Sequence, residues 1–81
     1  MNRSEILSKL EIVFQEFFNC SELKLLPDTV SDDIEEWDSV AHIQLVFEIE
    51  EQFSVQFEAE DIHKMNSISI LIDKIIELSE K

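Results

Sequence analysis

The residues with the clearest chemical potential are Asp38, Ser39 and Val40, which stand at the start of a predicted amphipathic helix. A serine hydroxyl can carry a covalent group. The N–H groups and the dipole at a helix start favour a negatively charged group there. A phosphodiester on Ser39 therefore suits this position. Serine and aspartate are also favoured near helix N-caps, and this purely structural role uses the same geometry.

The spacing of apolar residues predicts the helices that position this serine. The expected ranges are residues 4–18, with Ser4 as N-cap, then 39–53, a short helix over 59–64 introduced by Phe57, and 67–78, capped by Asn66 or Ser67. At about 100° per residue, one arc of the first helix is apolar. Its members are Ile6, Leu10, Val13, Phe14 and Phe17, and those of the last helix are Ile68, Leu71, Ile72, Ile75 and Ile76.

Residues 19–38 form a long connection with one proline and an acidic run. A connection of this length in a small domain is usually functional or held down by apolar anchors. The candidate anchors are Leu23, Leu25, Leu26, Val30 and Ile34. We expect an all-α fold, a small bundle of three main helices and one short helix, as a single domain over residues 1–81.

Charge and composition restrict the function. The net charge of −13 opposes binding to nucleic acids and to anionic membranes, and it favours partners with basic patches. One cysteine, Cys20, excludes an intramolecular disulfide, and we expect its thiol to be buried in a reduced, cytoplasmic protein. No signal peptide or membrane-spanning stretch is apparent in the sequence. We expect a monomer without stable membrane insertion.

The segment EWDSVAHIQL, residues 36–45, resembles the attachment segment of acyl carrier proteins. The resemblance extends over nearly the whole chain. It includes the long connection, the serine that opens the second helix, the short third helix and the apolar spacing of Phe53, Phe57, Met65 and Ile68. Members of this family fold as helical bundles. The resemblance therefore implies the same all-α fold class that the apolar spacing predicts.

The resemblance implies that Ser39, within the motif Asp38-Ser39-Val40, accepts a 4'-phosphopantetheine arm from coenzyme A. A phosphopantetheinyl transferase would attach the arm, whose thiol carries acyl groups as thioesters. The implied partners are acyl-loading and acyl-transfer enzymes of fatty-acid, polyketide or other specialised biosynthesis. The chain itself is expected to be a non-catalytic carrier with no metal site.

The second helix has two predicted faces. The inner face, with two residues of the last helix, matches the family's acyl-chain cavity and comprises Leu45, Val46, Ile49, Phe53, Ile68 and Ile72. The outer side forms a candidate docking surface, in which apolar side chains enter a partner's pockets while carboxylates meet basic residues. Its members are Ile43, Phe47, Glu48, Glu50 and Glu51.

Several residues depart from the common family pattern. Val40 replaces a leucine, Ala41 and Gln44 stand where acidic residues are frequent, and Trp37 precedes the motif. The Trp-Asp-Ser form resembles discrete carriers of specialised pathways, such as natural-product or surface-polysaccharide assembly.

The histidines predict no catalytic site. His42 falls on the inward arc, where a packed or half-exposed side chain is expected, and His63 is expected at the surface. Neither forms a triad with a nucleophile. Loops starting at Asp28 or Asp32 lack the ligands of a calcium-binding EF-hand. The remaining alternative is an acidic helical interaction or inhibitor protein without a prosthetic group.

Overall fold

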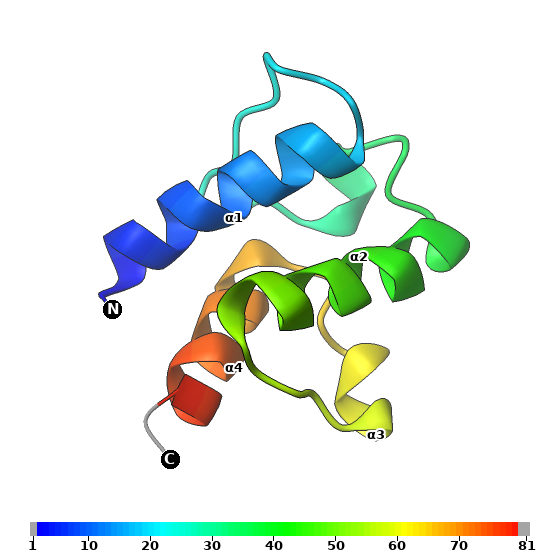
Figure 1. Ribbon diagram of the computed structural model, residues 1–81. Helices are drawn as coiled ribbons and strands as arrows, with labels where there is room; N and C mark the ends of the chain where they lie inside the picture. Colours follow the sequence, from blue (N-terminus) through cyan, green and yellow to red (C-terminus); the bar gives the residue numbers. More distant parts are fainter. Residues whose placement is uncertain (1, 80–81) are drawn as a thin grey trace.

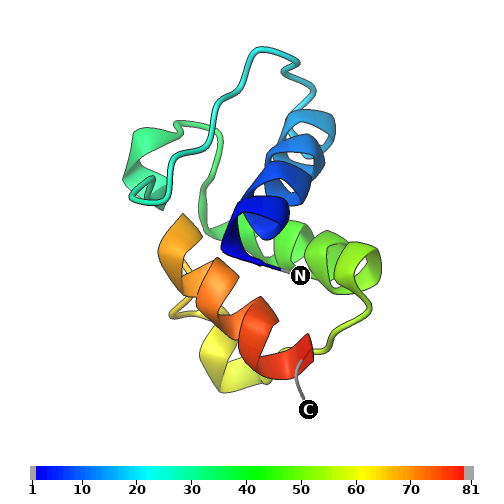
Figure 2. The same ribbon diagram turned by 90° about the vertical axis from the view of Figure 1, so that its left-hand side faces the viewer.

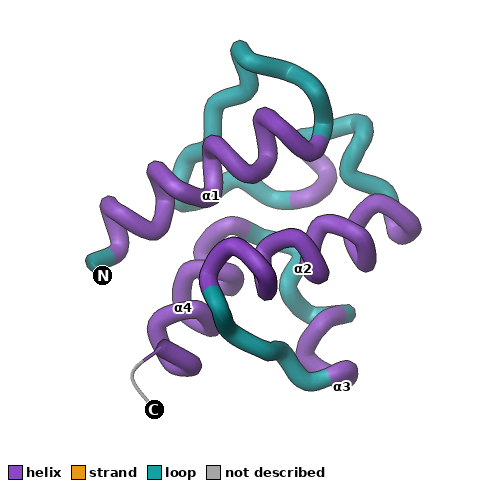
Figure 3. Tube along the Cα trace, viewed as in Figure 1, coloured by secondary structure: helices purple, strands orange, loops and turns teal. Residues whose placement is uncertain are grey.

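The computed structural model describes residues 2–79, which form helices joined by loops (Figure 3). The helices are α1 (Arg3–Phe17), α2 (Ser39–Phe53), α3 (Ala59–Ile62) and α4 (Ile68–Ser79), and a 3-10 turn, η1 (Ser31–Asp33), lies between α1 and α2. Three long helices and a short one are the predicted elements, so the all-α fold class is confirmed. None of the described helices is long and apolar enough to cross a membrane.

The helix α1 packs against both α2 and α4, and α3 lies on the side of the molecule away from α1 (Figures 1 and 2). Burial of apolar side chains from these elements supplies the main stabilising free energy of a domain this small. The buried apolar core contains Ile6, Leu10, Val13, Phe14, Leu25, Ile34, Trp37, Leu45, Val46, Ile49, Phe57, Met65, Ile68, Leu71, Ile72 and Ile75.

The start of α1 differs from the prediction. Asn2, not Ser4, is the N-cap, because its side-chain oxygen accepts the backbone N–H of Glu5 at 2.8 Å. Ser4 lies inside the first turn and is exposed. The helix begins at Arg3 because an asparagine in extended backbone can satisfy a first-turn donor as well as a serine can.

Two helix ends use left-handed backbone in a chain without glycine. Asn19, after α1, has a φ of 54°, and Ser54, the C-cap of α2, has a φ of 55°. Cys20 follows Asn19 on the connection and is exposed, so the expected burial of its thiol is wrong. Its backbone N–H donates to the carbonyl of Gln15 at 2.9 Å, in the turn that follows α1.

The connection between α1 and α2 is fixed to α1 by apolar and polar contacts. Leu25, Ile34 and Trp37 are buried, whereas the side chains of Leu26 and Val30 are exposed, so the prediction of these two as apolar anchors is wrong. The Glu11 carboxylate of α1 accepts the backbone N–H of Leu25 at 3.0 Å. A hydrogen bond from a backbone N–H to a carboxylate is charge-assisted and is therefore stronger than one between neutral groups.

The same connection is bonded to the start of α4. Val30 and Ser67 form an isolated antiparallel bridge. On either side, the Ser31 N–H donates to the carbonyl of Asn66 at 2.8 Å, and the Ile68 N–H donates to the carbonyl of Thr29 at 2.9 Å. The connection is therefore held at its middle as well as at its ends.

The short helix α3 ends at Ile62, two residues before the predicted end at Lys64. The Lys64 N–H donates to the carbonyl of Asp61 at 3.0 Å, and the Met65 N–H donates to that of Ile62 at 3.3 Å. These three-residue bonds tighten the chain into a turn, which places the Met65 side chain in the core with no exposed surface.

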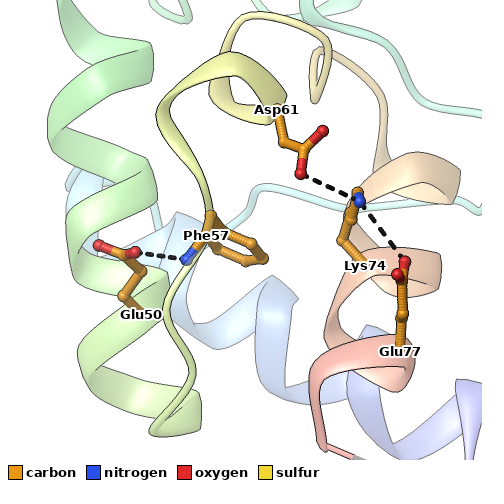
Figure 4. Close-up of polar contacts among 5 residues, drawn as sticks. All are labelled: Glu50, Phe57, Asp61, Lys74 and Glu77. Carbon is orange, nitrogen blue, oxygen red and sulfur yellow. Dashed lines mark hydrogen bonds and ion pairs between the residues drawn. The ribbon is translucent and has the colours of Figure 1, made fainter.

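Carboxylates hold α3 and its preceding loop to α2 and α4 (Figure 4). The Glu50 carboxylate of α2 accepts the backbone N–H of Phe57 at 2.7 Å. The Lys74 ammonium of α4 lies 3.1 Å from Asp61 of α3 and 3.4 Å from Glu77. The hydrogen bond to Asp61, together with the charges of both carboxylates, raises the pKa of Lys74.

The last helix confirms one of the two predicted caps. The Ser67 side-chain oxygen accepts the N–H of Ile70 at 3.2 Å, and its carbonyl accepts the N–H of Leu71 at 3.1 Å. The helix then continues to Ser79, one residue beyond the predicted end. Its predicted inner face is buried except for Ile76, which is half-buried.

Candidate functional site

Ser39 is the first residue of α2, and its side chain is exposed. The N-cap is Asp38, whose carboxylate accepts the N–H of Ala41 at 2.8 Å and whose carbonyl accepts the N–H of His42 at 2.8 Å. The alternative in which Ser39 acts as the cap is therefore wrong. Because the preceding carboxylate already fills that role, the Ser39 hydroxyl is not needed to start the helix.

The first turn of α2 keeps free donors beside this hydroxyl. Within residues 2–79, the backbone N–H groups of Ser39 and Val40 have no protein acceptor. Such groups carry the partial positive charge of a helix start, which stabilises a nearby anion by about 0.3–1 kcal/mol at an exposed site. The position thus suits a negatively charged group attached to Ser39.

A surface pocket of about 420 Å³ adjoins Ser39. Segments far apart in the sequence meet there: η1, the end of the long connection, the first turn of α2, and the turn between α3 and α4. The lining residues are Ser31, Asp32, Trp37, Asp38, Ser39, His42, Ile43, His63 and Asn66. The pocket is polar on several sides, with Trp37 and Ile43 as its large apolar members.

A buried hydrogen-bond chain forms one side of the pocket. The Trp37 indole Nε1–H donates to Nδ1 of His42 at 2.9 Å, and Nε2 of His42 is bonded to the carbonyl of Ile62. Trp37 also contacts the Phe14 ring edge-on, with 5.1 Å between the ring centroids. His42 is buried, as expected for a packed histidine. The sequence did not predict that His42 bonds both to Trp37, at the end of the long connection, and to Ile62 of α3.

Five of the six residues predicted to line an acyl-chain cavity lie together in the interior, and Phe53 packs against them. Leu45, Val46, Ile49, Ile68 and Ile72 are buried in the core. Phe53 is half-buried, and the Lys9 ammonium of α1 lies 4.8 Å from the centre of its ring. None of the six lines the pocket beside Ser39.

The candidate docking residues divide into exposed and engaged groups. Phe47 is 57% exposed, Val40 is 69% exposed, and Glu51 is also exposed. Ile43 is half-buried and lines the pocket beside Ser39. Val40 thus extends the exposed apolar surface along α2 from Phe47 towards Ser39.

Glu48 and Glu50 are half-buried and have partners within the chain. Glu48 accepts a hydrogen bond from the side chain of Gln52 at 3.2 Å, and Glu50 accepts the N–H of Phe57. Glu50 therefore has a structural role that its position on the helix surface does not reveal. Among the carboxylates of the predicted surface, Glu51 is the exposed one.

Within residues 2–79, no group of three or more histidine, cysteine, aspartate or glutamate side chains is placed to hold a metal ion. His63 is exposed, as expected, and lines the pocket beside Ser39. The chemistry that the arrangement offers is therefore an accessible hydroxyl at a helix start, beside a pocket lined by both polar and apolar side chains.

Comparisons with known proteins find relatives that match nearly the whole length of the chain. No family model matches the chain. The acyl carrier protein of Rubrobacter xylanophilus is 26% identical over 77 residues, covering 95% of both chains. That of Thermosynechococcus vestitus is 27% identical over 75 residues, covering 93% of both.

A solved structure has the same fold. It is the solution NMR structure of the holo acyl carrier protein from Geobacter metallireducens, which superposes with a TM-score of 0.83 and 24% sequence identity. The match covers 91% of this chain and 85% of that one. Together with the helical fold, the two curated relatives support assignment of the chain to the acyl carrier protein family.

Proposed function

We propose that this chain is a discrete acyl carrier protein, with a 4'-phosphopantetheine arm attached to Ser39 through a phosphodiester. The observation that carries the proposal is the exposed hydroxyl of Ser39 at the start of α2, in a chain whose curated relatives are acyl carrier proteins. When bound, the arm supplies a thiol that holds acyl groups as thioesters.

The residues around Ser39 fit a phosphodiester. The free N–H groups of Ser39 and Val40 can donate to its oxygens, and the dipole of α2 favours its charge. Asp38 keeps the helix start in place while the hydroxyl remains accessible. The adjoining pocket offers space and hydrogen-bonding groups beside the attachment point.

The attachment reaction requires a separate transferase and coenzyme A. The Ser39 oxygen would form a bond to the phosphorus of coenzyme A that bears the pantetheine. The bond between that phosphorus and the bridging oxygen of the pyrophosphate would break, which releases adenosine 3',5'-bisphosphate. The proton of the Ser39 hydroxyl would pass to the transferase. No catalytic residue of this chain is needed, so the protein acts as a cosubstrate of its partner enzymes.

The outer face of α2 is the proposed contact with those enzymes. Phe47 and Val40 offer exposed apolar area near Ser39, and Glu51 adds an exposed carboxylate. The net charge of −13 would steer basic surfaces of a transferase or an acyl-transfer enzyme towards this face. Ile43 would contribute at the edge of the pocket, whereas Glu48 and Glu50 are engaged within the chain.

The inner face of α2 is the proposed shelter for an acyl chain. The predicted cavity residues already lie together in the core, between α2 and α4. Because they are closely packed, an acyl chain would enter by separating these side chains rather than by filling the pocket beside Ser39. The Trp-Asp-Ser form favours a specialised pathway over general fatty-acid synthesis.

The decisive experiment is loading of the purified chain with coenzyme A, magnesium and a broad-specificity phosphopantetheinyl transferase. Intact-mass analysis should show the addition of one phosphopantetheine, which Ser39→Ala abolishes. The matched control is Ser31→Ala, which removes another hydroxyl residue from the same pocket and should leave loading intact. Absence of an adduct with several transferases would favour the alternative, an acidic interaction or inhibitor protein.

A second experiment tests the docking face. Glu51→Lys and Phe47→Ala should slow loading without altering the free energy of unfolding by more than about 0.5 kcal/mol, since both side chains are exposed. Glu58→Lys is the matched control, because it makes the same charge change at an exposed site outside α2. Equal loading rates for all these variants would contradict the proposed surface.

A further inference from the structure

The hydrogen-bond chain Trp37–His42–Ile62 has a direction that its chemistry determines. An indole N–H can only donate and a carbonyl can only accept, so Nδ1 of His42 is the acceptor and Nε2 carries the proton. Both ring nitrogens are thus used, in the neutral form of the imidazole. The rings of Trp37 and His42 are also stacked, with centroids 5.9 Å apart.

Protonation of His42 is incompatible with one of these bonds. A protonated Nδ1 would direct its own N–H at the N–H of Trp37, so two donors would face each other. The bond from Nε2 to the Ile62 carbonyl would remain available, because Nε2 is a donor in either state. Protonation therefore removes the contact with Trp37 specifically.

The location of this contact gives it a consequence for Ser39. Trp37 is the residue before Asp38, the N-cap that starts α2, and His42 is bonded through its own N–H to the carbonyl of Asp38. Both side chains line the pocket beside Ser39. Loss of the bond would remove the side-chain contact between the residue before the cap and the first turn of α2, while the packing of Trp37 against Phe14 would remain.

We propose that His42 is a pH-sensitive positioning residue for the turn that carries Ser39. In its neutral form His42 accepts the hydrogen bond of the Trp37 indole and fixes the approach to the helix start, and in its protonated form it loses that bond. The effect on loading rests on the proposed function, in which Ser39 is modified, but the switch itself does not.

Titratable groups from several elements lie around His42. Asp32 from η1 and Asp38 from the cap line the same pocket. His63, at the end of α3, lines it too. Asp61 of α3 is paired with Lys74, and the contact from α1 is the apolar ring of Phe14 against Trp37. The donor–acceptor match with Trp37 and Ile62 favours the neutral ring.

The single tryptophan makes the switch measurable. Its indole N–H gives one cross-peak in a nitrogen–proton NMR spectrum, and a titration from about pH 8 to about pH 5.5 crosses the range in which imidazoles change charge. We expect the Trp37 indole signal and the His42 ring signals to move with the same midpoint. A Trp37 signal that stays still while the His42 ring titrates would overturn the proposal.

Two variants separate His42 from other titrating groups. In His42→Asn, a neutral amide oxygen replaces Nδ1 as acceptor, so the pH dependence of the indole signal should disappear. His63→Asn makes the same change at the other histidine of the pocket and should leave the dependence in place. A dependence that survives in His42→Asn but is lost in His63→Asn would assign the effect to His63 and refute the proposal.

The effect on function is measured as a ratio of loading rates. With one transferase, the rate for the natural chain divided by that for His42→Asn should fall about five-fold between pH 8 and pH 5.5, the change typical of one neutral hydrogen bond. The ratio cancels the pH dependence of the transferase. A constant ratio alongside a shifting indole signal would refute the positioning role. Complete absence of loading would instead contradict the proposed function, leaving the indole titration as the test of the switch.

Discussion

The two sides of α2 are held by different kinds of interaction. Towards α1 and α4, fully buried aliphatic side chains pack against one another, and Leu10, Leu45 and Ile49 have no exposed surface. Towards α3 and the loop before it, polar contacts add to the apolar packing, from His42 to the Ile62 carbonyl and from the Phe57 N–H to Glu50. Apolar packing changes little with pH, whereas single polar contacts depend on protonation and geometry. Of these two polar contacts, the one made by His42 lies beside the pocket that adjoins Ser39.

The largest effect should come from breaking the apolar side. Leu10→Ala removes a fully buried side chain from α1 and should lower the free energy of unfolding by about 2–5 kcal/mol. The matched control is Ile12→Ala on the same helix, because Ile12 is 55% exposed and its truncation should cost far less. Urea denaturation followed by circular dichroism measures both. Equal losses would show that the core side of α1 is not where its stability arises.

Removing one polar connection should have a smaller effect. Glu50→Gln weakens the charge-assisted hydrogen bond from the Phe57 N–H. It should lower the free energy of unfolding by at most about 3 kcal/mol. Glu51→Gln changes the neighbouring, exposed carboxylate in the same way and should be nearly neutral. Hydrogen exchange should also show faster exchange of the Phe57 amide in Glu50→Gln. Unchanged Phe57 exchange would contradict the assigned role of Glu50.

The start of α2 provides the next test. Asp38→Ala removes the carboxylate that accepts the Ala41 N–H and should cost about 0.5–2 kcal/mol. Asp32→Ala, at an exposed carboxylate of the same pocket, is the control and should be close to neutral. Thermal unfolding of both variants compares the two carboxylates. A stable Asp38→Ala protein would mean that another group can cap α2.

Salt should have the smallest effect and act on the molecule as a whole. The net charge of −13 makes the folded chain repel itself, and salt shortens the screening length from about 30 Å at 0.01 M to about 3 Å at 1 M. The melting temperature should therefore rise by a few degrees as salt is added. Arg3 of α1 also forms an ion pair with Asp73 of α4. A flat or falling melting temperature would show that this pair and the Lys74–Asp61 pair outweigh the repulsion.

The sequence predicts α2 well because its apolar spacing continues without interruption from Leu45 to Phe53, and the helix indeed spans Ser39–Phe53. The helix starts were harder to predict. Neighbouring residues such as Asn2 and Ser4, or Asp38 and Ser39, have nearly equal capping propensity, so the choice depends on the path of the chain before the helix. The end of α3 was predicted too late because the buried Met65 overrides local helix propensity.

Within the candidate site, the position of Ser39 followed from the sequence, whereas the surroundings did not. The pairing of Trp37 with His42 crosses a helix cap, where neither helical nor strand periodicity applies. The engagement of Glu50 depends on the loop that returns Phe57 to α2. From the sequence alone, a carboxylate on the outer side of a helix is predicted to be a surface group, because the course of the following loop is not known. Tertiary contacts of this kind have no local signal in a single sequence.

The left-handed residues Asn19 and Ser54 bear on the unfolded chain as well as the folded one. Each carries a β-carbon in a backbone region that disfavours one, at a cost of about 1–2 kcal/mol for an ordinary residue and less for asparagine. A glycine at either place would relieve that cost, but it would also give the denatured ensemble more conformations to lose on folding. The chain has no glycine among its 81 residues. Its folded state therefore has local backbone strain at Asn19 and Ser54, and its unfolded state has a lower conformational entropy than it would have with glycine at these positions.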